Sequence, residues 1–128
     1  MRRGMLLIVD DQPAVRQLIR EALAGEGYPV ETAASGYEAL AVAAARRPKL
    51  VVCDLRMPGM SGLEMLREMQ KIAPGTPAIL ITAYGELSDT REAERIGVRH
   101  LLIKPFDINE LRAAVRALLA AVSGADEP

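Results

Sequence analysis

Five short runs of apolar residues recur along the chain. They lie at 5–9, 28–33, 50–54, 78–81 and 101–103, and the third run ends in a carboxylate. A short apolar run bounded by turn residues is typical of a strand buried on both faces of a sheet. The run at 28–33 is less apolar than the others, which favours a place nearer the sheet edge. The pattern therefore predicts five strands.

Helix signals lie between the first strands. Pro13 stands at a position that proline tolerates, the first turn of a helix, and apolar residues then recur at helical spacing. Ser35-x-x-Glu38 and Ser61-x-x-Glu64 are capping-box patterns, in which the serine accepts a backbone hydrogen bond and the glutamate returns one. We therefore expect each of the first three strands to be followed by a helix.

Two more helices follow the last two strands. A thin apolar face predicts a weaker helix at about 86–96, which we expect to move most easily. Asp107-x-x-Glu110 begins a final helix with a long apolar stripe, and 123–128 reads as a short polar tail. Strands that alternate with helices predict an α/β fold with a parallel sheet covered on both faces. We expect one domain over 1–128, with its core at about 5–122.

Composition and charge exclude several classes of protein. The 128 residues are 50% hydrophobic and 26% charged, as in a globular protein, and no apolar run is long enough to span a membrane. A net charge of −1 and 3% aromatic residues argue against nucleic-acid binding, which favours basic surfaces and stacking rings. The single Cys53 lies in an apolar run and reads as a buried hydrophobe in a reducing compartment, which predicts the cytoplasm.

Polar residues follow four of the five apolar runs. Asp10 and Asp11 follow the first, Asp54 ends the third, Thr82 follows the fourth and Lys104 follows the fifth. The carboxyl ends of parallel strands share one edge of a sheet, where ligands bind in open α/β folds. We therefore expect three carboxylates, a hydroxyl and an ammonium group on one edge.

These groups suit phosphoryl transfer. Clustered carboxylates repel one another unless a cation intervenes, and oxygen ligands without histidine or a second cysteine suit Mg²⁺. A carboxylate beside such a cation can attack phosphorus and form an aspartyl phosphate. Lys104 and Thr82, with a backbone N–H, would then neutralise and hold the phosphoryl oxygens.

The chain resembles the receiver domain of two-component response regulators, and more narrowly the single-domain regulators of sporulation phosphorelays. The motifs that carry the resemblance are 7–11 (LIVDD), Asp54 with 57–62 (MPGMSG), 82–87 (TAYGEL) and 104–108 (KPFDI). The resemblance covers about 5–122 and implies a flavodoxin-like sheet in the order 2-1-3-4-5, with a cis bond before Pro105.

The resemblance also implies a role for each site residue. Asp54 would be the phosphoacceptor, with Thr82 and Lys104 completing the reactive site. Mg²⁺ would be held by Asp10, Asp11, Asp54 and the backbone carbonyl of Arg56.

The implied partners are a histidine kinase or histidine phosphotransferase. The chain would take phosphate from a phosphohistidine and relay it onward, as a cytoplasmic monomer that modifies itself and is not an enzyme in the usual sense. The matching docking residues are Val15, Leu18, Gly85, Pro105 and Phe106.

Simpler interpretations stand beside these. Asp10 and Asp11 could cap the first helix, Thr82 could be an ordinary strand residue and Lys104 a solvated one. Val15 and Leu18 could both belong to the core stripe of the first helix.

The sequence also departs from the family at one position. Leu101 stands where the family often has an aromatic switch residue, with His100 just before it. We further expect the bulk of Arg56 and Tyr84 to obstruct water that would hydrolyse the phosphoaspartate.

Three functions therefore compete. The first is a relay receiver. The second is a receiver that belongs to a longer DNA-binding regulator, or one that switches a protein partner. The third is a phosphate-ester hydrolase, which would want an acid two residues after the nucleophile, where this chain has Arg56.

Overall fold

The computed structural model describes residues 4–126, with side chains through residue 121. Within these residues, five strands and five helices alternate, as the pattern predicts. The strands are β1 (Leu6–Val9), β2 (Val30–Ala33), β3 (Leu50–Asp54), β4 (Ala78–Ala83) and β5 (Val98–Lys104). The helices are α1 (Pro13–Ala24), α2 (Gly36–Ala45), α3 (Gly62–Ile72), α4 (Thr90–Arg95) and α5 (Ile108–Asp126).

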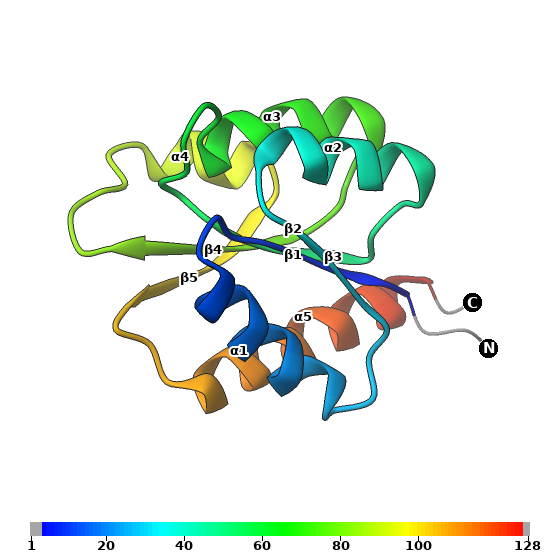
Figure 1. Cartoon of the computed structure of the whole chain (residues 1–128). Coiled ribbons are helices and arrows are strands. Elements are labelled where there is room, and N and C mark those ends of the chain that lie inside the picture. The colour runs from blue at the N-terminus through cyan, green and yellow to red at the C-terminus, as the bar shows by residue number, and fades with distance from the viewer. Residues whose placement is uncertain (1–3, 127–128) are drawn as a thin grey trace.

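The strands form one parallel sheet in the order β2-β1-β3-β4-β5. Figure 1 shows α2, α3 and α4 on one face of this sheet and α1 and α5 on the other. The predicted fold class and strand order are confirmed. No helix within residues 4–126 is both long and apolar enough to cross a membrane.

Alternating side chains of each strand supply the two cores. Leu7 and Val9 of β1 pack toward α2 and α3, whereas Leu6 and Ile8 pack toward α1 and α5. Strand β3 is buried along its whole length, since it lies in the middle of the sheet. Burial of one such aliphatic side chain contributes about 1.5–3 kcal/mol. The central strand therefore places its last residue, Asp54, on a rigid base.

Both edge strands differ from their predicted bounds. Strand β2 begins at Val30, two residues later than expected, and is only partly buried. Strand β5 begins at Val98, three residues earlier than expected, because exposed Arg99 and half-buried His100 interrupt its apolar pattern. An edge strand has a neighbouring strand on one side only and is less covered than a central strand. Polar residues can therefore face solvent there while the strand stays paired in the sheet.

Helix α4 is six residues long and replaces the longer helix predicted at about 86–96. The Asp89 side chain accepts a hydrogen bond from the Glu92 N–H and fixes the start of the helix. Residues before it form a turn in which Gly85 has φ +83°, a conformation that favours glycine. The segment 84–89 is therefore a loop rather than a helical turn.

Helix α5 runs on to Asp126, four residues into the predicted polar tail. Alanines at 120, 121 and 125 favour continuation of the helix, since alanine has the highest helix propensity. Residues 127 and 128 of the predicted tail lie outside the described residues. The predicted helix N-caps are closer to the structure. Ser61 and Glu64 form a complete capping box. Ser35 accepts the Glu38 N–H as predicted, but the Glu38 carboxylate accepts the Ala34 N–H and not the Ser35 N–H.

Candidate functional site

The carboxyl ends of the strands carry the predicted polar residues on one edge of the sheet. Asp10 follows β1, Asp54 ends β3, and Lys104 ends β5 beside Ala83 of β4. Strands β1 and β3 are neighbours, with Val9 paired to Cys53, so Asp10 and Asp54 leave adjacent strands. Parallel pairing is what brings residues from distant parts of the chain to this edge.

Asp54 and Lys104 form the central contact of the site. The Lys104 Nζ lies 2.6 Å from the Asp54 Oδ1, and the Arg56 backbone N–H donates to Oδ2 at 3.1 Å. The Asp54 side chain is 5% exposed and that of Lys104 is 41% exposed. Burial lowers the pKa of Lys104, but the hydrogen bond and negative charge of Asp54, with Asp10 and Glu86, raise it overall. Lys104 is therefore held as a cation against the buried carboxylate and is not simply solvated.

Asp10 is the second buried carboxylate. Its Oδ1 accepts a hydrogen bond from the Gln12 N–H at 2.8 Å. Burial raises the pKa of Asp10; the bond from Gln12 opposes this, while the charges of Asp54 and Asp11 raise it further. The N-cap of α1 is Gln12, which makes no side-chain cap bond, and Asp11 is exposed. The alternative in which Asp10 and Asp11 merely cap α1 is therefore wrong.

The acidic residues have the oxygen ligands that a hard cation prefers, but their side chains do not converge on a common point. Asp10, Asp11 and Asp54 offer carboxylate oxygens, which Mg²⁺ prefers, and besides burial the charges of Asp54 and Asp11 raise the pKa of Asp10. Among residues 4–126, no group of three His, Cys, Asp or Glu side chains is placed to hold a metal ion. In this structure Lys104 holds Asp54 and the Gln12 N–H holds Asp10. The role of the Arg56 carbonyl as a metal ligand stays a prediction.

Thr82 is buried at the same edge, but its hydroxyl is turned to Glu86. It lies 3.2 Å from the Glu86 Oε1 and 3.2 Å from the Ala83 carbonyl oxygen. The same Glu86 oxygen accepts the Ala83 N–H at 2.8 Å, and the other carboxylate oxygen lies 2.9 Å from the Arg56 Nε. The role of Glu86 at this edge was not predicted from the sequence, because the residue was assigned to the start of a helix. Its position, one residue after a glycine and four after Thr82, was the available signal.

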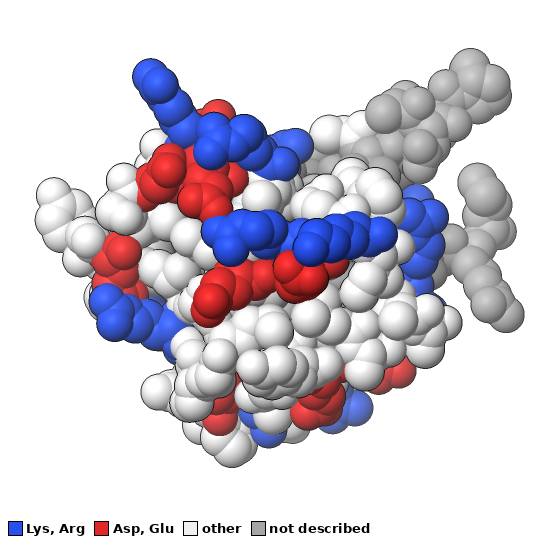
Figure 2. Space-filling view, turned by 90° about the horizontal axis from the view of Figure 1, so that it is seen from above, with Lys and Arg blue, Asp and Glu red and all other residues white. Residues whose placement is uncertain are grey.

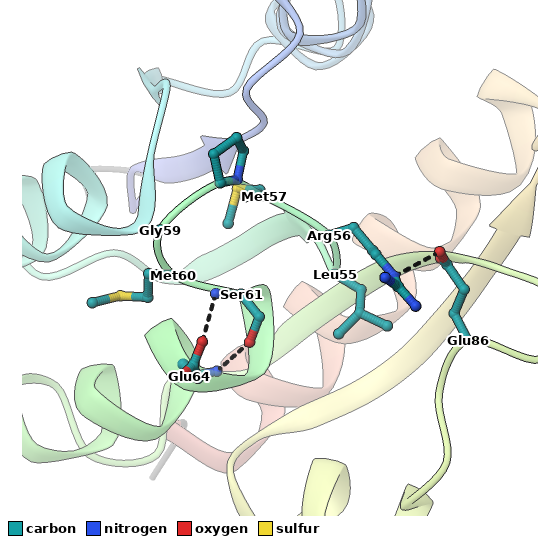
Figure 3. A pocket seen from close by; sticks show the side chains of 9 residues that line it. Leu55, Arg56, Met57, Gly59, Met60, Ser61, Glu64 and Glu86 are labelled. Carbon is teal, nitrogen blue, oxygen red and sulfur yellow. Dashed lines mark hydrogen bonds and ion pairs between the residues drawn. The ribbon is translucent and has the colours of Figure 1, made fainter.

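The Arg56–Glu86 ion pair closes one end of a groove of about 650 Å³ beside the β3–α3 loop. Figure 3 shows this pair and, further along the groove, the reciprocal bonds between Ser61 and Glu64. The remaining lining residues are Leu55, Met57, Pro58, Gly59 and Met60. The groove therefore runs from the reactive edge along the segment that follows Asp54.

The predicted docking residues divide into two groups. Leu18 is 53% exposed, and Gly85 and Pro105 are also exposed. Val15 and Phe106 are half-buried and pack against the core on the α1–α5 face. The predicted cis bond between Lys104 and Pro105 is present. Leu18, Gly85 and Pro105 are thus accessible to a partner, whereas Val15 and Phe106 also support the core.

Leu101 and His100 lie near α4 rather than at the reactive edge. Leu101 packs against the core beneath α2, α3 and α4, and both residues line a cavity of about 310 Å³ between α4 and β5. The His100 Nε2 is buried, and no group of the described residues forms a hydrogen bond with it. The packed position of Leu101 explains how an aliphatic residue is accommodated where the family often has an aromatic one.

Charge on the helical face above the sheet is mixed. Figure 2 looks onto the face of α2, α3 and α4, where basic and acidic side chains adjoin one another. Arg67 of α3 pairs with Glu92 of α4, and Lys71 pairs with Glu68 within α3. Paired charges of this kind cancel at long range, so this face does not form a basic surface.

The response regulator receiver domain profile matches residues 6–116. This chain belongs to the response regulator receiver domain family. The receiver is 42% identical to sporulation initiation phosphotransferase F of Bacillus subtilis (strain 168) over 119 residues, which are 93% of this chain and 96% of that protein. It is 36% identical over 128 residues to the DNA-binding transcriptional regulator NtrC of Salmonella typhimurium. That match takes in all of this chain but spans only 27% of the NtrC length.

The receiver is also similar to a solved structure, the response regulator receiver domain protein (CheY-like) of Methanospirillum hungatei JF-1. The TM-score is 0.89 at 29% identity, and the match covers 96% of this chain and 98% of that one. Family membership thus agrees with the strand order and with the motifs on which the resemblance was based. The match spans almost all of the phosphotransferase but about a quarter of NtrC. A receiver domain of this kind therefore makes up nearly the whole of one relative and only part of the other.

Proposed function

We propose that this receiver accepts a phosphoryl group from a phosphohistidine onto Asp54 and passes it to a histidine phosphotransferase. The observation that carries the proposal is the buried Asp54 carboxylate, held at the end of the central strand by the Lys104 ammonium at 2.6 Å. A charged oxygen fixed beside a cation is suited to attack phosphorus and to have the product charge neutralised.

In the proposed reaction an Asp54 carboxylate oxygen forms a bond to phosphorus. The bond between phosphorus and the donor imidazole nitrogen breaks, and its electron pair stays with the imidazole. Lys104 then binds one phosphoryl oxygen, and the Thr82 hydroxyl with the Ala83 N–H donates to another. Asp10, Asp11 and Asp54 would hold Mg²⁺, which supplies further neutralisation of the phosphoryl charge. The chain modifies itself in this step, so we do not class it as an enzyme.

Onward transfer is supported by the similarity to a protein named a phosphotransferase, 96% of whose length the match covers. The exposed Leu18, Gly85 and Pro105 are available for docking of a histidine kinase or phosphotransferase. We propose a monomer that acts in the cytoplasm and binds neither nucleic acid nor membrane itself. We expect its setting to be a phosphorelay of the sporulation type.

The similarity to NtrC favours a second candidate, in which the receiver controls a longer DNA-binding regulator or a separate protein partner. Onward transfer separates the two. The receiver is phosphorylated with radiolabelled phosphodonor, freed of it, and mixed with a purified four-helix histidine phosphotransferase. A relay predicts label on the phosphotransferase within seconds to minutes and none with its histidine replaced by glutamine. Label that stays on the receiver, or is released only as inorganic phosphate, favours the second candidate.

A further inference from the structure

The Glu86 carboxylate contacts three donor groups at the reactive edge. It accepts hydrogen bonds from the Ala83 N–H at 2.8 Å and from the Thr82 hydroxyl at 3.2 Å, which also lies 3.2 Å from the Ala83 carbonyl oxygen, and it forms an ion pair with the Arg56 Nε at 2.9 Å. Two come from the end of β4 and one from the loop after β3. One side chain therefore ties together two loops that flank Asp54.

In the proposed reaction, a phosphoryl group on Asp54 would use two of these donors, the Thr82 hydroxyl and the Ala83 N–H. Ile81 pairs with Asp54 across the sheet, so Thr82 and Ala83 emerge directly beside the carboxylate, and Arg56 follows it by two residues. Carboxylate and phosphoryl oxygens both take charge-assisted hydrogen bonds from such groups. The pKa of Glu86 is lowered, chiefly by the Ala83 N–H and further by Thr82 and Arg56 despite some desolvation, which agrees with a carboxylate held as an anion.

We propose that Glu86 is an internal competitor of the phosphoryl group for the Thr82 hydroxyl and the Ala83 N–H. In the resting receiver Glu86 holds both donors, and phosphorylation of Asp54 withdraws them and releases Glu86. Glu86 is thus a positioning residue that sets how readily the donors reach the phosphoryl group. This inference rests on the proposed acceptance of phosphate by Asp54.

Release of Glu86 would free the loop that leads into α4. In that loop Tyr84 is 91% exposed, and Gly85 is exposed in a left-handed conformation. Helix α4 has only six residues, with Ala93 as its one buried residue. Glu86 therefore supplies side-chain contacts that join this weakly packed segment to the reactive edge.

The test compares Glu86→Gln with the parent in the presence of Mg²⁺ and beryllofluoride, a phosphoryl analogue that binds the acceptor carboxylate. Competition predicts that Glu86→Gln binds the analogue about fivefold more tightly, the effect of about one net hydrogen bond. The Ala83 amide resonance of free Glu86→Gln should also move toward its position in the analogue-bound parent. Glu94→Gln, which removes an equal charge from exposed α4, should change neither quantity.

A double-mutant cycle separates competition from simple charge repulsion. In a Thr82→Ala background, Glu86→Gln should increase the affinity for beryllofluoride by a smaller factor. On a logarithmic scale the increase should be less than half of that in the parent, because one contested donor is gone. An undiminished gain in that background, or an Ala83 resonance that does not move, would overturn the inference. Failure of the parent itself to bind the analogue or take up phosphate would instead contradict the proposed function.

Discussion

The Lys104 ammonium lies 2.6 Å from the Asp54 carboxylate, although the two residues stand at the ends of non-adjacent strands β3 and β5. The long lysine side chain reaches across the end of β4, which lies between them. Asp54 is nearly buried and therefore depends on this contact for neutralisation of its charge. The same contact prepares the ammonium group to meet the phosphoryl charge.

Replacement of Lys104 by glutamine removes that cation while keeping a long polar side chain. We expect the free energy of unfolding at pH 7 to fall by about 1 kcal/mol, a value discounted because Lys104 is partly exposed. Phosphorylation by a small acyl phosphate should slow at least about tenfold, since the phosphoryl charge loses its ammonium partner. Denaturant unfolding and a phosphorylation time course measure the two effects; an unchanged rate would contradict the role of Lys104.

The pH dependence of this contact follows from the raised pKa of Lys104. Because the folded value lies above the ordinary 10.5, the stabilisation is complete below pH 10.5 and is lost as the pH rises through the folded value. Above neutral pH, the difference in unfolding free energy between parent and Lys104→Gln should therefore shrink only in strongly alkaline solution. A difference that vanishes between pH 6 and 9 would show that another group is responsible.

Asp10 also has a raised pKa, above the ordinary 3.8, because burial and the neighbouring carboxylates disfavour its charged form. The folded state then binds the proton more tightly, so stability is lost as the pH rises from 3.8 through the folded value. Asp10→Asn should stabilise the domain at pH 7 by about 1 kcal/mol and weaken its Mg²⁺-dependent phosphorylation. Thermal unfolding at pH 7 and pH 3 measures the effect. Equal stabilisation at both pH values would contradict this origin.

Gly62 brings α3 against the end of β3. A Cβ placed there would lie 2.4 Å from the Asp54 carbonyl oxygen, and the Gly62 N–H donates to the Leu55 carbonyl at 2.8 Å. Gly62→Ala should therefore cost about 2 kcal/mol of stability and slow phosphorylation by displacing Asp54. Gly75→Asn is the matched control, since among the described residues only the chain neighbours of Gly75 come within 4 Å of its Cβ position, and asparagine tolerates its positive φ. Equal losses in both variants would argue against a specific contact at Asp54.

Arg56 bears on the lifetime of the phosphoaspartate. Its side chain is 74% exposed and extends to Glu86 across the mouth of the groove. Arg56→Asn removes this bulk and should hasten hydrolysis about threefold, the effect of a barrier change below 1 kcal/mol. Tyr84→Asn should hasten it less, because Tyr84 is 91% exposed in the resting structure. Loss of label from purified phosphoprotein measures both; unchanged rates in both variants would refute the shielding hypothesis.

The sequence predicted those features that follow from strong local patterns. Continuous apolar runs located β1, β3 and β4, and parallel topology then placed Asp10, Asp54 and Lys104 on one edge. The hydrophobic pattern gave wrong bounds for the elements whose ends are set by tertiary contacts or caps. Edge pairing extends β5 back to Val98 through polar residues, and the Asp89 cap shortens α4. The role of Glu86 depends on a turn at Gly85 and on Arg56 from another loop, which no local periodicity reveals.

Intact-mass measurement after incubation with Mg²⁺ and a small acyl phosphate tests whether Asp54 accepts phosphate. The parent should gain the mass of one phosphoryl group and lose it on treatment with hydroxylamine, which cleaves acyl phosphates. Asp54→Ala should gain none, while circular dichroism shows that it keeps its fold. A parent that gains no mass, or an Asp54→Ala variant that gains as much as the parent, would contradict phosphorylation at Asp54.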